Sequence, residues 1–257
     1  MTGSALVGHT GFVGSNLLAQ HPFQHLYNSR NIAGIAGQSF ELLVFCGAQS
    51  KKWWANLNPD EDLRKIRAAL DPLTEVSAAK SVLISTIDVI PPLDGDIDES
   101  VNCRAMRSHP YGENRLHIEE FFRARFPNTL IVRLPGLFGP GLAKNVIFDL
   151  MNDNLLDKIN PASTFQYYDL ARLWADIETA LAAGLKLVHL FAEPLSTVAI
   201  AEKFFPGKAI GADAAPVAHY DFRTCHDRLF GGGGGYIEDR AAVLDRLGAF
   251  IRAEMAK

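Results

Sequence analysis

The sequence predicts an α/β fold built on a doubly wound parallel sheet, with a small lobe in the C-terminal part. Short apolar segments of strand length alternate with longer segments of helical length along most of the 257 residues. The first apolar segment begins near Ser4 and is followed at once by three closely spaced glycines and a helix start. Such alternation is typical of parallel strands joined by crossover helices. The 48% hydrophobic content suits a single domain, 1–257.

The three glycines form the turn between the first strand and the first helix. Glycine suits this turn because it takes positive φ, lets backbone approach a pyrophosphate and allows close packing of helix on strand. The helix N-terminus adds unpaired N–H groups and the positive end of the helix dipole. The pattern favours a dinucleotide ligand, although the same spacing occurs in ordinary tight turns. The residues expected to face the ligand are Gly8, Thr10, Gly11, Phe12, Val13 and Gly14.

The segment after the second strand is unusually short. We expect that strand near His25 to Asn28 and the next near Leu42 to Cys46, with only 13 residues, 29–41, between them. A complete doubly wound half needs a helix, a strand and a further helix here, and one crossover alone takes about a dozen residues. We therefore expect a sheet that lacks one strand, with a short helix near 32–38 crossing directly to the next parallel strand. The adenine end of a cofactor site would then be open.

The later elements continue the alternation. Helices are expected over 60–79, 111–125, 170–183 and 238–255, and strands over 81–85, 129–134 and 185–190. The stretch 91–110 contains prolines and acidic residues that interrupt both periodicities, so we expect a polar loop over the site. Ligands in such sheets lie beyond the carboxyl ends of the strands. That rule places around one cleft Gly47, Ala48, Thr86, Asp88, Pro135 and Gly136.

Thr86 and Tyr111 are candidate catalytic residues. Thr86 ends an apolar strand, and Tyr111 opens a helix one turn before Arg115. Because residues four apart share a helix face, we expect the Arg115 cation to favour the ionised form of the Tyr111 phenol, which a general acid or base near neutral pH requires. Thr86 would donate to the same substrate oxygen. The alternative is that Tyr111 packs at a helix start while Arg115 is a solvated surface charge.

With these features the chain resembles the extended short-chain dehydrogenase/reductases, a family of epimerases, dehydratases and reductases. The glycine turn matches the family's cofactor turn, and Thr86 and Tyr111, 25 positions apart, match its catalytic serine or threonine and its tyrosine. Residues 133–141 look like the strand and loop that pass the nicotinamide, including Pro135 and Gly136. Residues 165–170 look like the segment that returns to the substrate side. The resemblance implies a Rossmann-like fold, NAD or NADP as cofactor and a substrate-side lobe.

One departure from the family is Arg115, which stands where the motif Tyr-x-x-x-Lys has lysine. The resemblance assigns this position to hold the ribose and polarise the phenol. Arginine keeps the charge, but its planar fork is larger than an ammonium, so the exchange is not conservative. The exchange therefore bears on catalysis more than on cofactor binding.

Cofactor choice depends on the end of the second strand. An acidic residue about 20 positions after the glycines would bond the ribose 2′-hydroxyl of NAD. This chain instead has Asn28, Ser29 and Arg30 there. An arginine beside a small hydroxyl suits a 2′-phosphate, so NADP is favoured slightly over NAD. The alternative is that Arg30 is a solvent-facing loop residue.

Two loops carry the candidates for substrate binding. Lys52, with Lys144 and Asn145, offers cations and an amide for a diphosphate, and Asp88 follows a nearby strand end. The tryptophan pair after Lys52 could cover a sugar or base. The alternative is a solvated lysine pair beside tryptophans that anchor a loop. A nucleotide sugar is inferred from the resemblance, as is a lobe formed mainly by 141–168 and 191–236.

Composition excludes several classes of function. A net charge of -4 gives no basic field for nucleic acid or for an anionic membrane surface. No apolar run reaches membrane-spanning length and no leader precedes the first strand, so we expect a cytoplasmic protein. Cys46, Cys103 and Cys225 form neither a disulfide framework nor a metal pattern, and the eight histidines show no ligand pairing. We expect no metal. The glycine run 231–235 lacks the Lys and Ser/Thr of a P-loop and favours a flexible loop.

The sequence thus predicts an NAD(P)-dependent epimerase, dehydratase or reductase acting on a nucleotide sugar or a related carbonyl or hydroxyl compound. A dinucleotide-binding sensor or scaffold with little or no turnover is the alternative, motivated by Arg115 and the missing strand. A third interpretation is a relic of the fold that binds no cofactor. The helix at Tyr111 often forms a homodimer interface in this family, so Phe121, Phe122 and Phe126 serve such an interface or the core.

Overall fold

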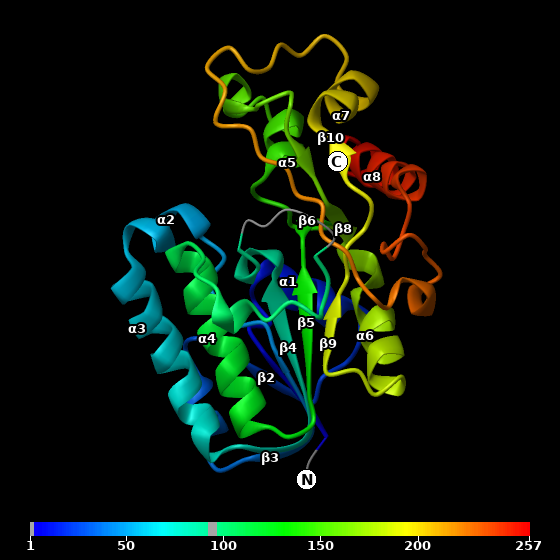
Figure 1. Cartoon of the computed structure of the whole chain (residues 1–257). Helices are drawn as coiled ribbons and strands as arrows, with labels where there is room; N and C mark the ends of the chain where they lie inside the picture. The colour runs from blue at the N-terminus through cyan, green and yellow to red at the C-terminus, as the bar shows by residue number, and fades with distance from the viewer. Residues whose placement is uncertain (1–2, 92–96) are drawn as a thin grey trace. The chain divides into compact units, whose positions relative to one another are not determined.

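The computed structural model describes residues 3–91 and 97–257. The chain divides into two compact units (Figure 1). The first consists of the N-terminal part together with Glu99–Leu134 and Leu173–His189, and the second is formed mainly by Pro135–Arg172 and Leu190–Lys257. Within the described residues, no helix combines the length and the apolar character needed to cross a membrane.

A six-stranded sheet forms the centre of the first unit, in the order β2-β1-β3-β4-β5-β9. The strands are β1 (Ser4–Val7), β2 (His25–Tyr27), β3 (Ser39–Phe45), β4 (Ser77–Thr86), β5 (Thr129–Leu134) and β9 (Leu187–His189). All neighbouring strands are parallel. The α/β fold class that the sequence predicts is confirmed.

The sheet is trimmed at the β2 edge. After β2 the chain forms one 3₁₀ turn, η1 (Ile32–Ile35), and then enters β3 on the far side of β1. Val7 of β1 is therefore paired with Tyr27 on one side and Phe45 on the other. In the doubly wound order 3-2-1-4-5-6 another strand lies outside the second. Among the described residues no strand occupies that place, as the short 29–41 segment predicts.

Helices cover both faces of this sheet. They are α1 (Phe12–Gln20), α2 (Lys52–Leu57), α3 (Pro59–Leu70), α4 (Pro110–Arg125) and α6 (Leu173–Ala182). Figure 1 shows α3 and α4 side by side on one face, while α1 and α6 belong to the other. Gln20 of α1 accepts a hydrogen bond from the Trp174 N–H of α6 through its side-chain oxygen, at 3.0 Å.

One helix prediction and one loop prediction need correction. The helix expected over 60–79 ends at Leu70, because Pro72 in the following 3₁₀ turn η2 (Asp71–Glu75) has no N–H to continue it. The segment from Ser77 instead joins β4, paired with β3, so the sheet overrides the helix propensity of its alanines. Residues 49–56, expected to be a loop, contain most of α2.

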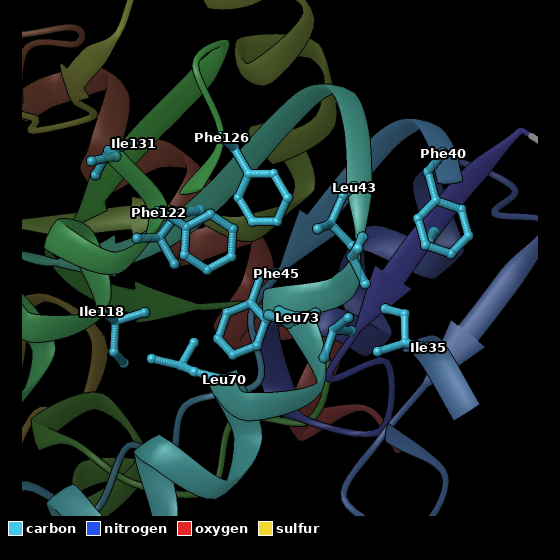
Figure 2. Close-up of a cluster of buried hydrophobic side chains, with 14 of the residues drawn as sticks. Ile35, Phe40, Leu43, Phe45, Leu70, Leu73, Ile118, Phe122, Phe126 and Ile131 are labelled. Atoms are coloured by element: carbon cyan, nitrogen blue, oxygen red, sulfur yellow. The ribbon is translucent and has the colours of Figure 1, made fainter. Parts of the chain in front are cut away.

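The core of the first unit lies between the sheet and the α3–α4 face (Figure 2). Phe122 of α4 and Phe126, which follows the end of α4, are 0% and 2% exposed there, and Phe121 packs partly buried against the same cluster. Phe122 contacts Phe45 of β3, with ring centroids 5.3 Å apart. Of the two uses that the sequence left open, Phe122 and Phe126 therefore serve the core.

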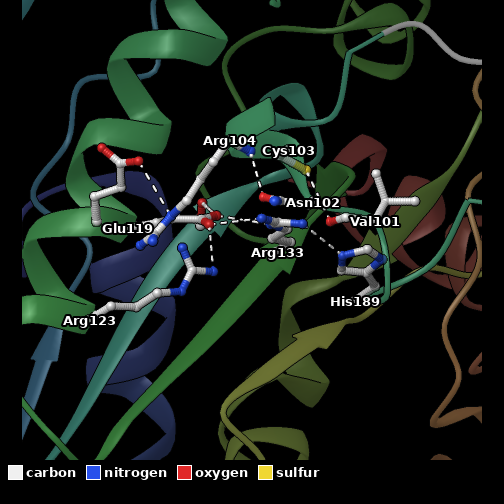
Figure 3. A network of polar contacts seen from close by, with 10 residues as sticks. Val101, Asn102, Cys103, Arg104, Glu119, Arg123, Arg133 and His189 are labelled. Atoms are coloured by element: carbon white, nitrogen blue, oxygen red, sulfur yellow. Dashed lines mark hydrogen bonds and ion pairs between the residues drawn. The ribbon is translucent and has the colours of Figure 1, made fainter. Parts of the chain in front are cut away.

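A buried ion pair joins α4 to the sheet (Figure 3). Glu119 of α4, 0% exposed, accepts hydrogen bonds from Arg133 of β5 at 2.8 and 2.9 Å and from the Ser85 hydroxyl of β4 at 2.6 Å. Arg123 donates to the same carboxylate at 3.0 Å. Burial alone would raise the pKa of Glu119, but the Arg133, Ser85 and Arg123 donors outweigh it and hold that pKa below its ordinary value.

The same arginine reaches the next strand. Arg133 Nη1 lies 3.1 Å from Nε2 of His189 in β9, and both side chains are buried. Because a guanidinium can only donate, Nε2 must accept, which leaves the His189 proton on Nδ1 and the ring neutral. One network therefore connects α4, β4, β5 and β9.

The second unit contains short strands and three helices. Its strands are β6 (Gly136–Phe138), β7 (Thr164–Phe165), β8 (Tyr167–Asp169) and β10 (Leu195–Ser196), and its helices are α5 (Val146–Met151), α7 (Thr197–Phe204) and α8 (Arg240–Met255). β6 and β8 are parallel, and β7 and β10 antiparallel. Buried Gln166 donates to the carbonyls of Ala192 and Phe222 at 2.7 and 2.8 Å, and accepts from Phe222 N–H.

The glycine run 231–235 folds into a hydrogen-bonded turn. Gly232 N–H donates to the Asp227 carbonyl at 3.0 Å, and Gly235 N–H donates to the Asp227 side chain at 2.9 Å. Gly233 N–H donates to the carbonyl of Tyr236. These three amides therefore bond to the protein itself, in a turn with defined hydrogen bonds where the sequence favours a flexible loop.

Replacing Glu119 by Gln should destabilise the first unit strongly. The change leaves the Arg133 guanidinium buried without its counterion, and breaking such a pair costs about 3–5 kcal/mol. The matched control is Glu61→Gln, which removes a surface pair with Arg64 and should cost less than about 1 kcal/mol. The measurement is urea denaturation of both variants at neutral pH.

The loss of folding stability in Glu119→Gln should depend on pH in a defined direction. The Glu119 pKa is lowered in the folded chain, so its stabilisation is present above its ordinary value of 4.5 and disappears as the pH falls through the folded pKa. The difference between wild type and Glu119→Gln should therefore shrink in acid. An equal difference at pH 7 and below pH 4 would contradict this account of the network.

Candidate functional site

The glycine turn has the geometry of an anion-binding helix start. Gly8 has a φ of +92°, and a Cβ there would lie 2.7 Å from the Cys46 carbonyl oxygen. A Cβ on Gly14 would lie 2.1 Å from the Gly8 carbonyl oxygen. At Gly11 the nearest such atom is 3.4 Å away, so the protein itself leaves room for a side chain. An open approach to the α1 N-terminus, where Gly11 provides no side-chain cap, fits a pyrophosphate.

The rest of the turn is anchored to β2. Gly8 N–H donates to the Tyr27 carbonyl at 2.8 Å, and His9 Nδ1 lies 3.1 Å from the same oxygen. Thr10 is exposed, while Phe12 and Val13 are half-buried in the first turn of α1. The amides of the turn are thereby held at the carboxyl end of β1.

The end of β2 forms a compact polar turn. The Asn28 side-chain oxygen accepts from Arg30 N–H at 2.9 Å, and Asn28 N–H donates to the Asn31 side chain at 2.7 Å. Ser29 and Arg30 are exposed. Within 3–91 and 97–257, no hydrogen bond or ion pair of the Arg30 guanidinium is seen. The Asn28 side chain is thus committed to the backbone, while Arg30 has the access that a phosphate ligand requires.

The first turn of α4 is locked in place around Tyr111. Tyr111 N–H donates to the Asn56 side chain of α2 at 2.9 Å, and His109 caps the helix by accepting from Gly112 N–H at 3.1 Å. A Cβ on Gly112 would lie 2.1 Å from the Asp88 carbonyl oxygen, so only glycine permits this approach. Three contacts therefore fix the Tyr111 backbone.

Arg115 is buried beneath Tyr111. Its guanidinium carbon lies 4.1 Å from the centroid of the Tyr111 ring, and the residue is 4% exposed. The two Nη atoms bond the Asp62 carboxylate of α3 at 2.5 and 3.2 Å, and Nη2 also donates to the Gln49 carbonyl. The alternative of a solvated surface charge is wrong, because Arg115 makes a buried bidentate ion pair.

The expected ionisation of Tyr111 also needs correction. Burial raises the pKa of its phenol, and this effect outweighs the Arg115 guanidinium, which lowers it. Asp88 raises the same pKa and Lys52 lowers it. The physical reason is desolvation, together with the pairing of Arg115 to Asp62. The neutral phenol is therefore the resting form near pH 7.

Thr86 lies beside a charged cluster at the end of β4. Its hydroxyl oxygen accepts from Asp88 N–H at 3.2 Å and lies 3.5 Å from an Asp88 carboxylate oxygen. The other carboxylate oxygen is 2.5 Å from Lys52 Nζ and 3.6 Å from His109 Nε2. Burial would raise the pKa of Asp88, but His109 and Lys52 outweigh it and hold that pKa below its ordinary value.

The remaining predicted residues fall into both units. Gly47 and Ala48 follow β3 in the first, where Ala48 packs against the hydrophobic core. Pro135 and Gly136 belong to the second unit, and Gly136 N–H donates to the Gln166 carbonyl at 3.0 Å.

Lys144 and Asn145, both predicted to bind a diphosphate, also belong to the second unit. The Asn145 oxygen caps α5 by accepting from the N–H groups of Ile147 and Phe148, and its amide donates to the Leu137 carbonyl. Capping therefore commits the Asn145 side chain, which argues against the diphosphate role.

Four residues that position Tyr111 were missed by sequence reasoning: Asn56, Asp62, His109 and Gly112. Pro110 at the first helical position is a signal that would have placed a cap at His109. Asp62 is one of three acidic residues in the first turn of α3, and no local pattern distinguishes it as the buried one.

No protein-family model matches the sequence. No curated protein matches it either. Solved structures, in contrast, match the fold of this chain. A dTDP-4-dehydrorhamnose reductase from Bacillus anthracis in complex with NADP is 16% identical, with a TM-score of 0.70 over 98% of this chain and 99% of the other.

Two further structures represent other reactions. A variant of UDP-glucuronic acid 4-epimerase from Bacillus cereus, in complex with NAD, is 13% identical with a TM-score of 0.68 over 97% of this chain and 98% of the other. A dTDP-glucose 4,6-dehydratase variant from Streptomyces venezuelae, with NAD bound, is 14% identical with a TM-score of 0.71 over 98% and 96%. This chain therefore has the fold of the extended short-chain dehydrogenase/reductases.

Proposed function

We propose that this protein is an NAD(P)-dependent enzyme that acts on a nucleotide sugar or a related carbonyl or hydroxyl compound. The observation that carries the proposal is the fixed pair of hydroxyls, Thr86 at the end of β4 and Tyr111 at the start of α4, in the unit that also holds the glycine turn. The named reactions of the structural neighbours, which include reduction, epimerisation and dehydration of nucleotide sugars, support the substrate class.

Tyr111 is the proton carrier in this proposal. The bound nicotinamide would supply or accept the hydride. Because burial keeps the Tyr111 phenol protonated, its O–H is ready to give a proton to a substrate oxygen as that oxygen gains charge. The Thr86 hydroxyl accepts from Asp88 N–H and donates to an Asp88 carboxylate oxygen at 3.5 Å, and it would exchange this long contact for one to the same substrate oxygen. Reduction of a carbonyl is the direction that this resting state favours.

The cofactor in this proposal lies along the glycine turn, with NADP preferred. The open approach at Gly11 suits the pyrophosphate, and the exposed Arg30 at the end of β2 suits a 2′-phosphate. Ser29 beside it adds a hydroxyl.

A dinucleotide-binding sensor with little turnover is the second candidate. The observation that favours it is the Arg115–Asp62 ion pair, which occupies the two Nη atoms of the residue at the family's lysine position. Cofactor binding without turnover would follow if no other cation assisted proton transfer from Tyr111.

Cofactor preference is tested by replacing Arg30 with Ala. We expect NADP binding, measured by calorimetry on cofactor-stripped protein, to weaken by about tenfold or more, because a charge-assisted contact to phosphate is lost. NAD binding should change little. Arg67→Ala, an exposed arginine on α3, is the control and should leave both affinities unchanged. Equal loss of NAD and NADP affinity would contradict a 2′-phosphate role.

The catalytic assignment is tested with Tyr111→Phe. This change should lower turnover at least about 100-fold, since it removes the proton carrier, and leave NADP affinity within about twofold. Turnover is followed by nicotinamide absorbance across a panel of nucleotide sugars and simple carbonyl compounds. Tyr220→Phe in the second unit is the matched control. Unchanged turnover of Tyr111→Phe would overturn the assignment, and NADP binding with no turnover by wild type would favour the sensor.

A further inference from the structure

The cation that the sequence assigns to Tyr111 is already paired. Arg115 is 4% exposed and forms its bidentate pair with Asp62, which is itself 2% exposed. Arg115 stacks under the Tyr111 ring and lowers the pKa of its phenol, but both of its Nη atoms donate to the Asp62 carboxylate. A hydrogen bond from a cation to a substrate oxygen would therefore come from a second cation near Tyr111.

Helix α2 directs a lysine toward the same site. Lys52 and Asn56 are four residues apart and so share one face of the helix. Asn56 uses that face to accept from Tyr111 N–H at 2.9 Å. Trp53 and Leu57, which lie on another face, are 67% and 75% exposed. The orientation of α2 therefore brings Lys52 to the start of α4.

The contacts of Lys52 link its charge, through the Asp88 carboxylate, to the Thr86 hydroxyl. Its Nζ is 2.5 Å from one carboxylate oxygen of Asp88, and the other oxygen of that carboxylate is 3.5 Å from the Thr86 hydroxyl. The Lys52 side chain is 38% exposed, against 16% for Asp88. The ammonium thus has a partly buried partner on one side and solvent access on the other.

We propose that Lys52 is the catalytic cation of this site, and that Arg115 is a positioning residue fixed on Asp62. The inference rests on the proposed function. Lys52 would donate a hydrogen bond from Nζ to the substrate oxygen that Tyr111 and Thr86 face. The proton that moves is that of the Tyr111 phenol: its O–H bond would break and a new O–H bond would form on the substrate oxygen, while a bound reduced nicotinamide would supply the hydride. Lys52 stays protonated throughout.

The electrostatic surroundings of Tyr111 make this testable without substrate. Among the residues that the structure describes, the charged or titratable groups that face it are Arg115 of its own helix, Asp88 after β4, Lys52 of α2 and His109 at the helix cap. Loss of Lys52 removes a positive charge from this set. The Tyr111 pKa should then rise by about one unit.

The experiment is a ¹⁹F NMR titration of cofactor-free protein in which 3-fluorotyrosine replaces its six tyrosines. Fluorination makes the phenols more acidic and brings their ionisation into an accessible range. Tyr111→Phe identifies the resonance. We expect a rise of about one pKa unit in Lys52→Met, recovery in Lys52→Arg and no shift in the control Lys51→Met. An unchanged Tyr111 pKa in Lys52→Met would overturn the proposal.

Asp88→Asn separates a direct effect from one that acts through Asp88. If Lys52 acts on the phenol itself, Lys52→Met should still raise the Tyr111 pKa in the Asp88→Asn background, which also avoids an unpaired buried carboxylate. If the double variant equals Asp88→Asn alone, Lys52 only neutralises Asp88 and the proposal fails. Because neither arm uses a cofactor, the result is independent of whether the protein turns over a substrate.

Discussion

The close docking of α4 on the end of β4 is the constraint on which the candidate site depends. It is made at two levels: Gly112 packs against the Asp88 carbonyl, and about two turns further along Glu119 accepts a hydrogen bond from the Ser85 hydroxyl. Tyr111 precedes Gly112, and Thr86 follows Ser85. The relative position of the two candidate hydroxyls is therefore set by backbone packing and by a buried ion pair, and not by the loops around them.

Three ion pairs compensate the cost of burying charge around this docking. Glu119 is paired with Arg133, Asp62 with Arg115, and Asp88 with Lys52. The first two are almost fully buried, so they fix geometry without leaving charge free to act on a ligand. The third is partly open to solvent. Burial makes the first two ion pairs rigid, and the same burial raises the pKa of the Tyr111 phenol. The fixed position of Tyr111 and the protonated form of its phenol therefore have one physical origin.

The parts of this structure that follow local rules were predictable from the sequence. The glycine turn, the exact span of β5 and the missing outer strand come from residue type, periodicity and the simple length of segment 29–41. The prediction of one helix over 60–79 was wrong in its second half. There Pro72 ends the helix, and the pairing of β4 with β3 outweighs the helix propensity of the alanines. The environment of Arg115 could not be predicted for a different reason. Its partner Asp62 is 53 residues away in the sequence, and nothing in the sequence of α3 shows that this carboxylate is the buried one.

The two ends of the proposed cofactor site are built on different principles. At the reacting end, the position of Tyr111 is over-determined by Asn56, His109 and the close approach of Gly112. At the adenosine end, β2 is the sheet edge, and its closing turn is held by the side chains of Asn28 and Asn31. A trimmed edge offers little surface for shape recognition, so selectivity there must come from charge. In the proposed site, the exposed arginine after β2 would supply that charge from a different element than those that hold Tyr111, so cofactor preference would vary without disturbing proton transfer.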